Sequence, residues 1–213
     1  RADAQGLRRP RGHRRLDAGR AGGKTQGRIV NAPVRGNARA GGAVHAIVVM
    51  GVSGCGKSTV GSALADRVGW RFADGDDFHP PANVEKMRAG VPLDDTDRAP
   101  WLARLNALLR DSAAAGRPVV LACSALRQRY RDALAEGMPG LRFVPLAGSA
   151  ELIGDRLAAR RHRYMPAALL ASQFATLEPP ADALTLDVAE PVDALVEAVV
   201  ARLLTTDEES GEP

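Results

Sequence analysis

Residues 51–58 read GVSGCGKS and have the spacing G-x-x-x-x-G-K-[ST] of a phosphate-binding loop, called here the phosphate loop. Its glycines let the backbone curl so that successive N–H groups point at phosphate oxygens, and a following helix N-terminus adds positive charge. In that chemistry Lys57 reaches the β and γ phosphates and the Ser58 hydroxyl is a ligand of Mg²⁺. The nucleotide-binding residues predicted are Gly51, Val52, Ser53, Gly54, Cys55, Gly56, Lys57, Ser58 and Thr59.

Two carboxylates, Asp74 and Asp76, follow the second β-rich run of the chain. If the backbone stays extended through Gly75, both side chains point to the same side, beside the phosphate loop. Asp74 then supports Mg²⁺ through water, together with Ser58, and Asp76 accepts the proton of a hydroxyl that attacks the γ phosphate. The alternative is that these acids cap the following helix, a role we expect for Asp77.

Strands and helices that would position these groups alternate from residue 44 onward, which predicts an α/β fold with a parallel sheet covered on both faces. The phosphate loop lies between the first strand and the first helix, as its chemistry requires. The expected strands are residues 45–50, 71–73, 119–122, 142–146 and 184–188. The expected helices are residues 57–68, 83–88, 97–115, 127–136, 150–161 and 192–204.

The composition excludes several classes of protein. Of the 213 residues, 45% are hydrophobic and 25% charged, which is typical of a globular chain and not of a collagen, a coiled coil or a wholly disordered protein. The longest strongly apolar run, residues 46–52, is far shorter than the roughly 20 residues that span a bilayer, so we expect no membrane partner. Cys55 and Cys123 lack metal-type spacing, and we expect reduced thiols in a cytoplasmic protein.

The net positive charge of the chain lies at its N-terminal end. Residues 1–43 hold 11 Lys or Arg and 2 Asp, whereas the remainder holds 18 basic and 23 acidic side chains. The net charge of +4 therefore comes from the N-terminal segment, and we expect no specific nucleic-acid partner for the rest. This Arg- and Gly-rich segment has no aromatic residue and is expected to be disordered. An inert extension or misassigned start is favoured over a polyanion-binding arm or a targeting peptide.

Downstream of the phosphate loop the chain shows no GTPase or ABC-type ATPase signature, which favours a small-molecule kinase. Residues 74–87 read DGDDFHPPANVEKM, residues 90–102 GVPLDDTDRAPWL, residues 123–134 CSALRQRYRDAL and residues 165–178 MPAALLASQFATLE. In this order behind a phosphate loop, the four blocks resemble those of the gluconokinases, small ATP-dependent kinases of D-gluconate. The resemblance covers residues 46–204.

The resemblance implies a P-loop kinase fold, with a five-stranded parallel sheet, flanking helices and a small mobile lid. It implies ATP with Mg²⁺, phosphorylation of the 6-hydroxyl of D-gluconate, and a homodimer. Another acceptor such as shikimate, a nucleoside monophosphate, or nucleotide-dependent binding without turnover stay open as alternatives. The expected segments are a disordered basic extension over residues 1–43, a kinase domain over residues 44–205, and an acidic frayed end over residues 206–213.

By the same resemblance, Lys57, Asp76, Arg156 and Arg160 are expected to carry catalysis, the two arginines as part of the lid. Cations there would neutralise the charge that spreads over the transferring phosphoryl group. The alternative is a solvated helix face whose cations only meet water. Arg163 stands where the family usually has His.

For the acceptor, the resemblance implies a pocket within residues 76–130. A polyhydroxy carboxylate needs cations for its carboxylate and hydrogen-bonding groups for its hydroxyls. The candidates are Arg98 and Arg127 for the carboxylate, and Asp76, His79 and Ser124 for the hydroxyls.

Four neighbouring side chains have two interpretations each. Asn83 and Lys86 either contact the acceptor or belong to the scaffold, and the residues alone do not decide between these roles. Trp101 is favoured as a packing anchor over a sugar-stacking platform, and Tyr130 is favoured as structural. The last expected strand, residues 184–188, resembles the segment that lies along the adenine in related kinases.

Overall fold

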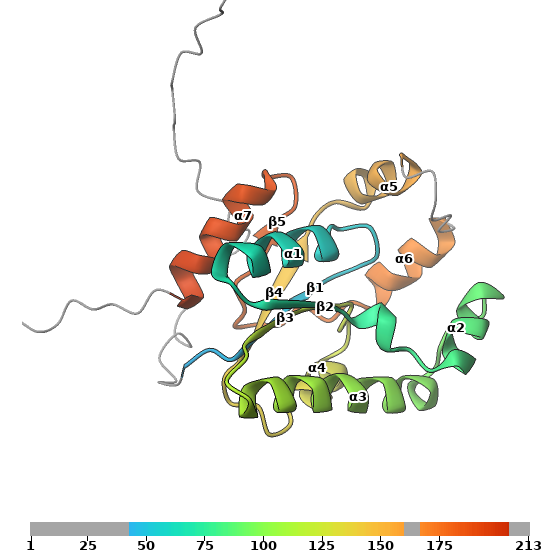
Figure 1. Cartoon of the computed structure of the whole chain (residues 1–213). Helices are drawn as coiled ribbons and strands as arrows, with labels where there is room; N and C mark the ends of the chain where they lie inside the picture. The colour runs from blue at the N-terminus through green and yellow to red at the C-terminus, as the bar shows by residue number, and fades with distance from the viewer. Residues whose placement is uncertain (1–42, 160–166, 205–213) are drawn as a thin grey trace, which may run out of the picture.

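The computed structural model describes residues 43–159 and 167–204 (Figure 1). The expected basic extension and acidic end lie almost wholly outside these ranges, and both stay predictions. Within the described ranges, no helix has the length and apolar character needed to cross a membrane.

A five-stranded parallel sheet forms the centre of the domain, with strand order β2-β3-β1-β4-β5. This confirms the predicted α/β fold. All residues of β1 and β3 are buried, because helices cover both faces of the sheet. The strands are β1 (Ala46–Met50), β2 (Arg71–Asp74), β3 (Val119–Cys123), β4 (Leu141–Ala147) and β5 (Leu186–Asp187).

Helices α1 and α7 lie on one face of the sheet and α3 and α4 on the other, while α2 projects from the body (Figure 1). A 3₁₀ helix, η1, follows β2, and a π-helical turn, η2, continues α7. The helices are α1 (Lys57–Val68), η1 (Gly75–Phe78), α2 (Pro81–Arg88), α3 (Asp95–Ala114), α4 (Gln128–Ala135), α5 (Ala150–Ala158), α6 (Ala167–Thr176), α7 (Val192–Val199) and η2 (Val200–Leu204).

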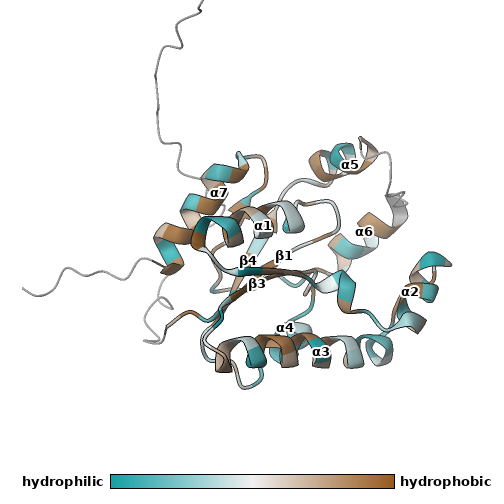
Figure 2. Cartoon of the chain, in the orientation of Figure 1, coloured by the Kyte–Doolittle hydropathy of each residue, from teal (hydrophilic) through white to brown (hydrophobic). Residues whose placement is uncertain are grey.

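The alternation of side chains along β1 divides the core into two clusters. Ile47 and Val49 pack with α1 and α7, whereas Ala46, Val48 and Met50 pack with α3 and α4. Figure 2 shows the strands and the inward faces of the helices as the hydrophobic part of the domain. The five β1 residues are fully buried, which fixes the strand that leads into the phosphate loop.

Two expectations about local structure are wrong. The backbone does not stay extended through Gly75, because η1 begins there and the Asp74 side chain accepts the Asp76 N–H at 3.1 Å. The capping acid is therefore Asp74, and Asp77 is exposed in the first turn. In addition, helix α6 was not among the expected helices, because its mostly apolar sequence shows no clear polar face.

The turn after β2 is fixed by two close contacts. A Cβ on Gly75 would lie 2.8 Å from the Ala122 carbonyl oxygen, so only glycine fits against β3. The Trp101 indole N–H donates to the Gly75 carbonyl at 2.7 Å, and Trp101 is 3% exposed. The buried indole thus holds the turn that carries Asp76.

Trp101→Phe is expected to lower the free energy of unfolding by about 1–3 kcal/mol, because the buried Gly75 carbonyl would lose its donor. Urea unfolding followed by circular dichroism measures this. Trp70→Phe is the matched control, since Trp70 is only partly buried and packs at the edge of the core. Equal losses in the two variants would contradict the role assigned to the Trp101 hydrogen bond.

Candidate active site

The phosphate loop connects the end of β1 to the start of α1, as predicted. Gly51, Gly54 and Gly56 have φ angles of 143°, 84° and 103°, which other residues rarely adopt. A Cβ on Gly54 would lie 2.5 Å from Leu157 Cγ, so the loop also packs closely against α5. Helix α1 has no side-chain cap and no acidic residue in its first turn, which leaves its N-terminal N–H groups suited to an anion.

Lys57 and Ser58 both make contacts near the phosphate loop. The Lys57 ammonium donates to the Val52 carbonyl at 3.0 Å, so it folds over the loop. The Ser58 hydroxyl donates to Asp74 Oδ2 at 2.6 Å, across 16 residues. Ser58 and Asp74 therefore lie together, as the sequence predicts.

The pair of Ser58 and Asp74 fits a magnesium ion. Mg²⁺ keeps several waters and usually takes only one or two protein oxygens together with phosphate oxygens. A hydroxyl and a carboxylate beside a phosphate loop supply that set. In the ranges the structure describes, no group of three or more His, Cys, Asp or Glu side chains could hold a metal by itself. A metal here would therefore depend on the phosphates as well.

The His79 ring lies against the ring of Trp101, which belongs to α3. The two rings stack with centroids 4.3 Å apart and planes 13° apart. Burial is the main cause that lowers the pKa of His79 below its ordinary 6.5; Arg98 lowers it further, and the Asp76 carboxylate raises it. Asn83 Nδ2 lies 3.5 Å from His79 Nδ1. A neutral imidazole beside Asp76 offers one donor and one acceptor.

Arg98 and Arg127 are brought into one charged cluster around Tyr130 and Asp95. The Tyr130 hydroxyl donates to Asp95 at 2.6 Å, and Arg98 lies over the Tyr130 ring at 5.5 Å from its centroid. Arg129 pairs with Asp95 at 2.7 Å. The pKa of Asp95 is lowered, first by the Tyr130 hydrogen bond and then by the nearby arginines, Arg127 and Arg98 included.

Asn83 and Lys86, whose role the sequence left open, make scaffold contacts in the structure. Lys86 pairs with Asp97 at 2.6 Å, and the Asn83 amide donates to the Asp97 carbonyl at 2.8 Å. Asp97 also forms a capping box with Asp94 at the start of α3. Trp101 is buried and Tyr130 is 8% exposed, as favoured for packing residues.

The segment after β3, residues 124–128, is called here the acceptor loop because it carries Ser124 and Arg127. Ala125 has a φ of 42°, a left-handed conformation that is uncommon for a residue with a side chain. Buried Arg131 holds this loop by donating to the Ala125 carbonyl at 3.1 Å and to the Gln128 side chain at 2.7 Å. The Gly51 N–H donates to the Ser124 carbonyl at 3.3 Å, which joins the two loops.

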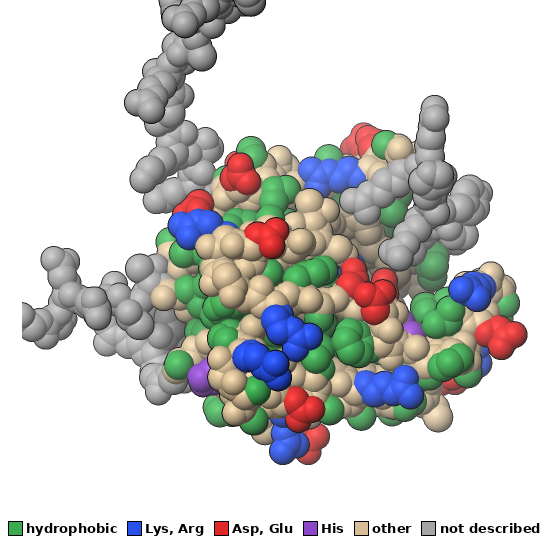
Figure 3. Space-filling view, viewed as in Figure 1, with side chains coloured by type: hydrophobic (Ala, Val, Ile, Leu, Met, Phe, Trp, Pro, Cys, Tyr) green, Lys and Arg blue, Asp and Glu red, His purple; other side chains and the backbone are tan. Residues whose placement is uncertain are grey.

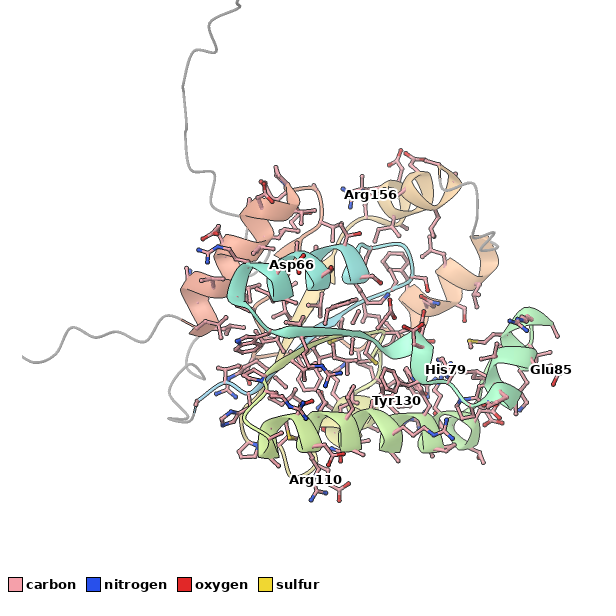
Figure 4. All side chains as sticks on the ribbon, in the orientation of Figure 1. Asp66, His79, Glu85, Arg110, Tyr130 and Arg156 are labelled. Atoms are coloured by element: carbon pink, nitrogen blue, oxygen red, sulfur yellow. The ribbon has the colours of Figure 1, made fainter. Side chains whose placement is uncertain are left out.

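A cavity of about 400 Å³ lies on the other side of the phosphate loop. Arg156 lines it and donates to the Val188 carbonyl at 2.7 Å. Figure 4 shows Arg156 and His79 well apart, so Arg156 does not lie in the region of His79. Arg160 lies outside the described residues. The cavity is lined by Gly54, Cys55, Gly56, Thr59, Val60, Arg156, Ala159, Val188, Glu190, Val192 and Leu195.

The two cysteines are buried free thiols. Burial raises the pKa of Cys123 to about 12, so it is a neutral core residue. Burial also raises the pKa of Cys55, whose neighbour Lys57 acts in the opposite direction more weakly. Neither thiol is suited to act as a nucleophile near pH 7.

Sequence reasoning gave no role to three residues that hold the site. Arg131 is buried beneath the acceptor loop, Gln173 bonds to Ser53, and Glu178 bonds to the backbone of Gln128. All three lie within the sequence blocks that carry the resemblance, which was the only signal for them. Their partners are far away in sequence, and spacing does not reveal such contacts.

Comparisons with known proteins show the family of this chain. A family model described as an AAA domain matches residues 47–180. The gluconokinase of Gluconobacter oxydans (strain 621H) is 53% identical over 136 residues, which are 64% of this chain and 76% of that protein. The thermoresistant gluconokinase of Escherichia coli (strain K12) is 41% identical over 160 residues, which cover 73% of this chain and 91% of that protein. This chain belongs to the gluconokinase family.

A solved structure supports the gluconokinase fold directly. The crystal structure of a gluconokinase from Sinorhizobium meliloti 1021 is 46% identical and covers 74% of this chain and 90% of its own, with a TM-score of 0.67. The resemblance read from the four sequence blocks is therefore confirmed at the level of family and fold.

The pKa of His79 is expected to lie below 6.5 and to fall further in Asp76→Asn, because losing the carboxylate removes a charge that favours the imidazolium. In Arg98→Ala it should rise, since a repelling cation is lost. NMR titration of the His79 ring protons measures both shifts, with Asp77→Asn as the matched control. An unchanged pKa in Asp76→Asn would contradict the electrostatic effect of Asp76 on His79.

Proposed function

We propose that the protein transfers the γ-phosphoryl group of ATP to the 6-hydroxyl of D-gluconate and releases 6-phospho-D-gluconate and ADP. The observation that carries this is one edge of the sheet where a phosphate loop, a carboxylate pair and a cluster of arginines meet, in a chain of the gluconokinase family. That likeness favours gluconate over shikimate as the acceptor.

For the nucleotide, the phosphate loop and Lys57 would bind the phosphates, and the cavity beside Val188 would take the adenosine. Lys57 would leave the Val52 carbonyl for the phosphate oxygens, a short swing of a flexible side chain. Ser58 and Asp74 would hold Mg²⁺, Asp74 through water, and the ion would offset negative charge on the phosphates. Roles for Arg156 and Arg160 at the transferring group stay part of this proposal.

For the acceptor, Arg98 and Arg127 would bind the gluconate carboxylate, since guanidinium groups match a carboxylate with paired hydrogen bonds. Arg98 lies over the Tyr130 ring, and the Asp95 carboxylate is close enough to attract both cations. His79 and Ser124 would bind hydroxyls, with His79 neutral near pH 7.

In the transfer step, the 6-hydroxyl oxygen would form a bond to the γ phosphorus while the bond from phosphorus to the bridging oxygen of ADP breaks. The hydroxyl proton would pass to the Asp76 carboxylate, which lies at the start of η1 beside His79. Lys57 would stabilise the negative charge that develops on the phosphate oxygens.

The cytoplasmic location, the homodimer, and the absence of membrane and specific nucleic-acid partners stay predictions. On the face drawn in Figure 3, basic and acidic side chains of the described residues are interspersed. That pattern differs from the single basic field typical of a nucleic-acid surface, but it concerns this face alone.

ADP release with MgATP should depend strongly on D-gluconate and yield 6-phospho-D-gluconate. The acceptor panel is D-gluconate, shikimate, other sugar acids, glucose and nucleoside monophosphates, at equal concentration. If shikimate or glucose were the preferred acceptor, gluconate would be the wrong substrate, but the assigned fold would be unaffected. Folded protein that binds ATP and uses no acceptor would favour a binding role.

Asp76→Asn should lower kcat by about 10²- to 10⁴-fold, because the attacking hydroxyl loses its proton acceptor. The KM for ATP should change little, since the phosphate loop is intact. Asp77→Asn is the matched control: it removes the same charge one residue away, from an exposed side chain. Near-normal turnover in Asp76→Asn would remove Asp76 as the base.

A further inference from the structure

Helix α6 and the two residues after it form a firmly packed unit. Leu170 is 7% exposed and lies in the cluster with α1 and α7. Leu177 packs against both core clusters, one on each face of the sheet. Its N–H donates to the Gln173 carbonyl at 3.0 Å, so the end of the helix and the following turn are continuous. Polar groups along this unit are therefore held at fixed positions.

In the second half of α6, Gln173 bonds to the phosphate loop. Its side-chain oxygen accepts the Ser53 N–H at 2.7 Å, and its side-chain nitrogen lies 3.1 Å from the Ser53 hydroxyl oxygen, to which it donates. Because a backbone N–H can only donate, the orientation of the amide is determined. Ser53 lies within the phosphate loop, and because its N–H donates to Gln173, the contact fixes the path of the loop backbone rather than adding a phosphate donor. The contact joins residues 120 positions apart in sequence.

At the C-terminal end of the unit Glu178 bonds to the acceptor loop. Its N–H donates to the Leu126 carbonyl at 2.8 Å, and its carboxylate accepts the Gln128 N–H at 2.6 Å. Helix α4 has no side-chain cap from its own N-cap residue, Arg127. Glu178 therefore supplies the missing cap from 50 residues away and fixes the backbone that carries Arg127.

We infer that Gln173 is a positioning residue for phosphoryl transfer: acting through Ser53, and with Glu178 on the same unit, it sets the phosphate loop and the acceptor loop at a fixed separation. This rests on the proposed function, since it concerns how ATP and the sugar acid are aligned. In-line transfer tolerates little misplacement between donor and acceptor. When alignment is lost, water attacks the γ phosphorus instead, the bond to ADP breaks, and inorganic phosphate forms.

A neutral amide suits this position for a second reason. A carboxylate at residue 173 could still accept the Ser53 N–H and could accept the Ser53 hydroxyl proton as well, so the packing contact would survive. It would also place a negative charge beside the phosphate loop, and that charge would repel the phosphates of ATP.

Three variants separate alignment from simple support of the fold. Gln173→Ala removes the contact, Gln173→Glu keeps it and adds charge, and Ser172→Ala is the matched control on the adjacent exposed position of α6. For each, the amounts of 6-phospho-D-gluconate and ADP formed, the KM for ATP and the Tm are measured.

Gln173→Ala should lower kcat about tenfold and reduce the phosphogluconate formed per ADP to about half or less, with the KM for ATP within about threefold. Gln173→Glu should raise the KM for ATP about tenfold with an unchanged Tm. Ser172→Ala should match the unsubstituted chain in every readout.

A phosphogluconate yield per ADP that stays at the unsubstituted value in Gln173→Ala would overturn the alignment role. An unchanged KM for ATP in Gln173→Glu would overturn the placement of residue 173 close to the bound phosphates, and this variant serves if Gln173→Ala fails to fold. If the unsubstituted chain makes no phosphogluconate, the proposed function fails, and titration of ATP binding to Gln173→Glu still tests the phosphate-loop contact.

Discussion

The parallel pairing of β1 with β3 is the constraint on which the site depends. The register runs from Ala46 opposite Val119 to Met50 opposite Cys123, so both strands end at the same edge. The chain therefore leaves β1 into the phosphate loop and leaves β3 into the acceptor loop at neighbouring points. The Gly51 N–H bond to the Ser124 carbonyl joins them there. An antiparallel pair would place these two loops at opposite edges of the sheet.

The loops at this edge are held by residues that lie far from them in sequence. The Trp101 indole fixes the Gly75 carbonyl from α3, and the Arg131 guanidinium fixes the Ala125 carbonyl from α4. Without such donors these backbone groups would be buried and unpaired, which costs about 1–3 kcal/mol each. The left-handed conformation of Ala125 persists because the surrounding contacts specify it. The polar site is therefore supported by the hydrophobic core beneath it.

The charged groups at the site are held in place by their neighbours. The Tyr130 hydroxyl donates to the Asp95 carboxylate, and this hydrogen bond, with the nearby arginines, lowers the pKa of Asp95. The negative charge in turn offsets the repulsion among the arginines around Tyr130. His79 has the opposite setting: burial between Trp101 and its own turn favours the neutral ring. One small region thus offers fixed cations for a carboxylate and neutral groups for hydroxyls.

The sequence by itself determined the α/β class, the five strands and the phosphate loop, because apolar periodicity and a contiguous glycine motif are local properties of the chain. The family followed from the resemblance of four contiguous sequence blocks. The sequence also singled out Asp74, Asp76, Arg98 and Arg127. It was wrong about the extended path through Gly75 and did not predict α6. Only the tertiary structure decided that Asp74 caps η1, that Lys86 serves Asp97, and that Gln173 and Glu178 hold the two loops. Those contacts join residues as many as 120 positions apart, and their geometry is set by how helices pack on the sheet, which no local pattern encodes.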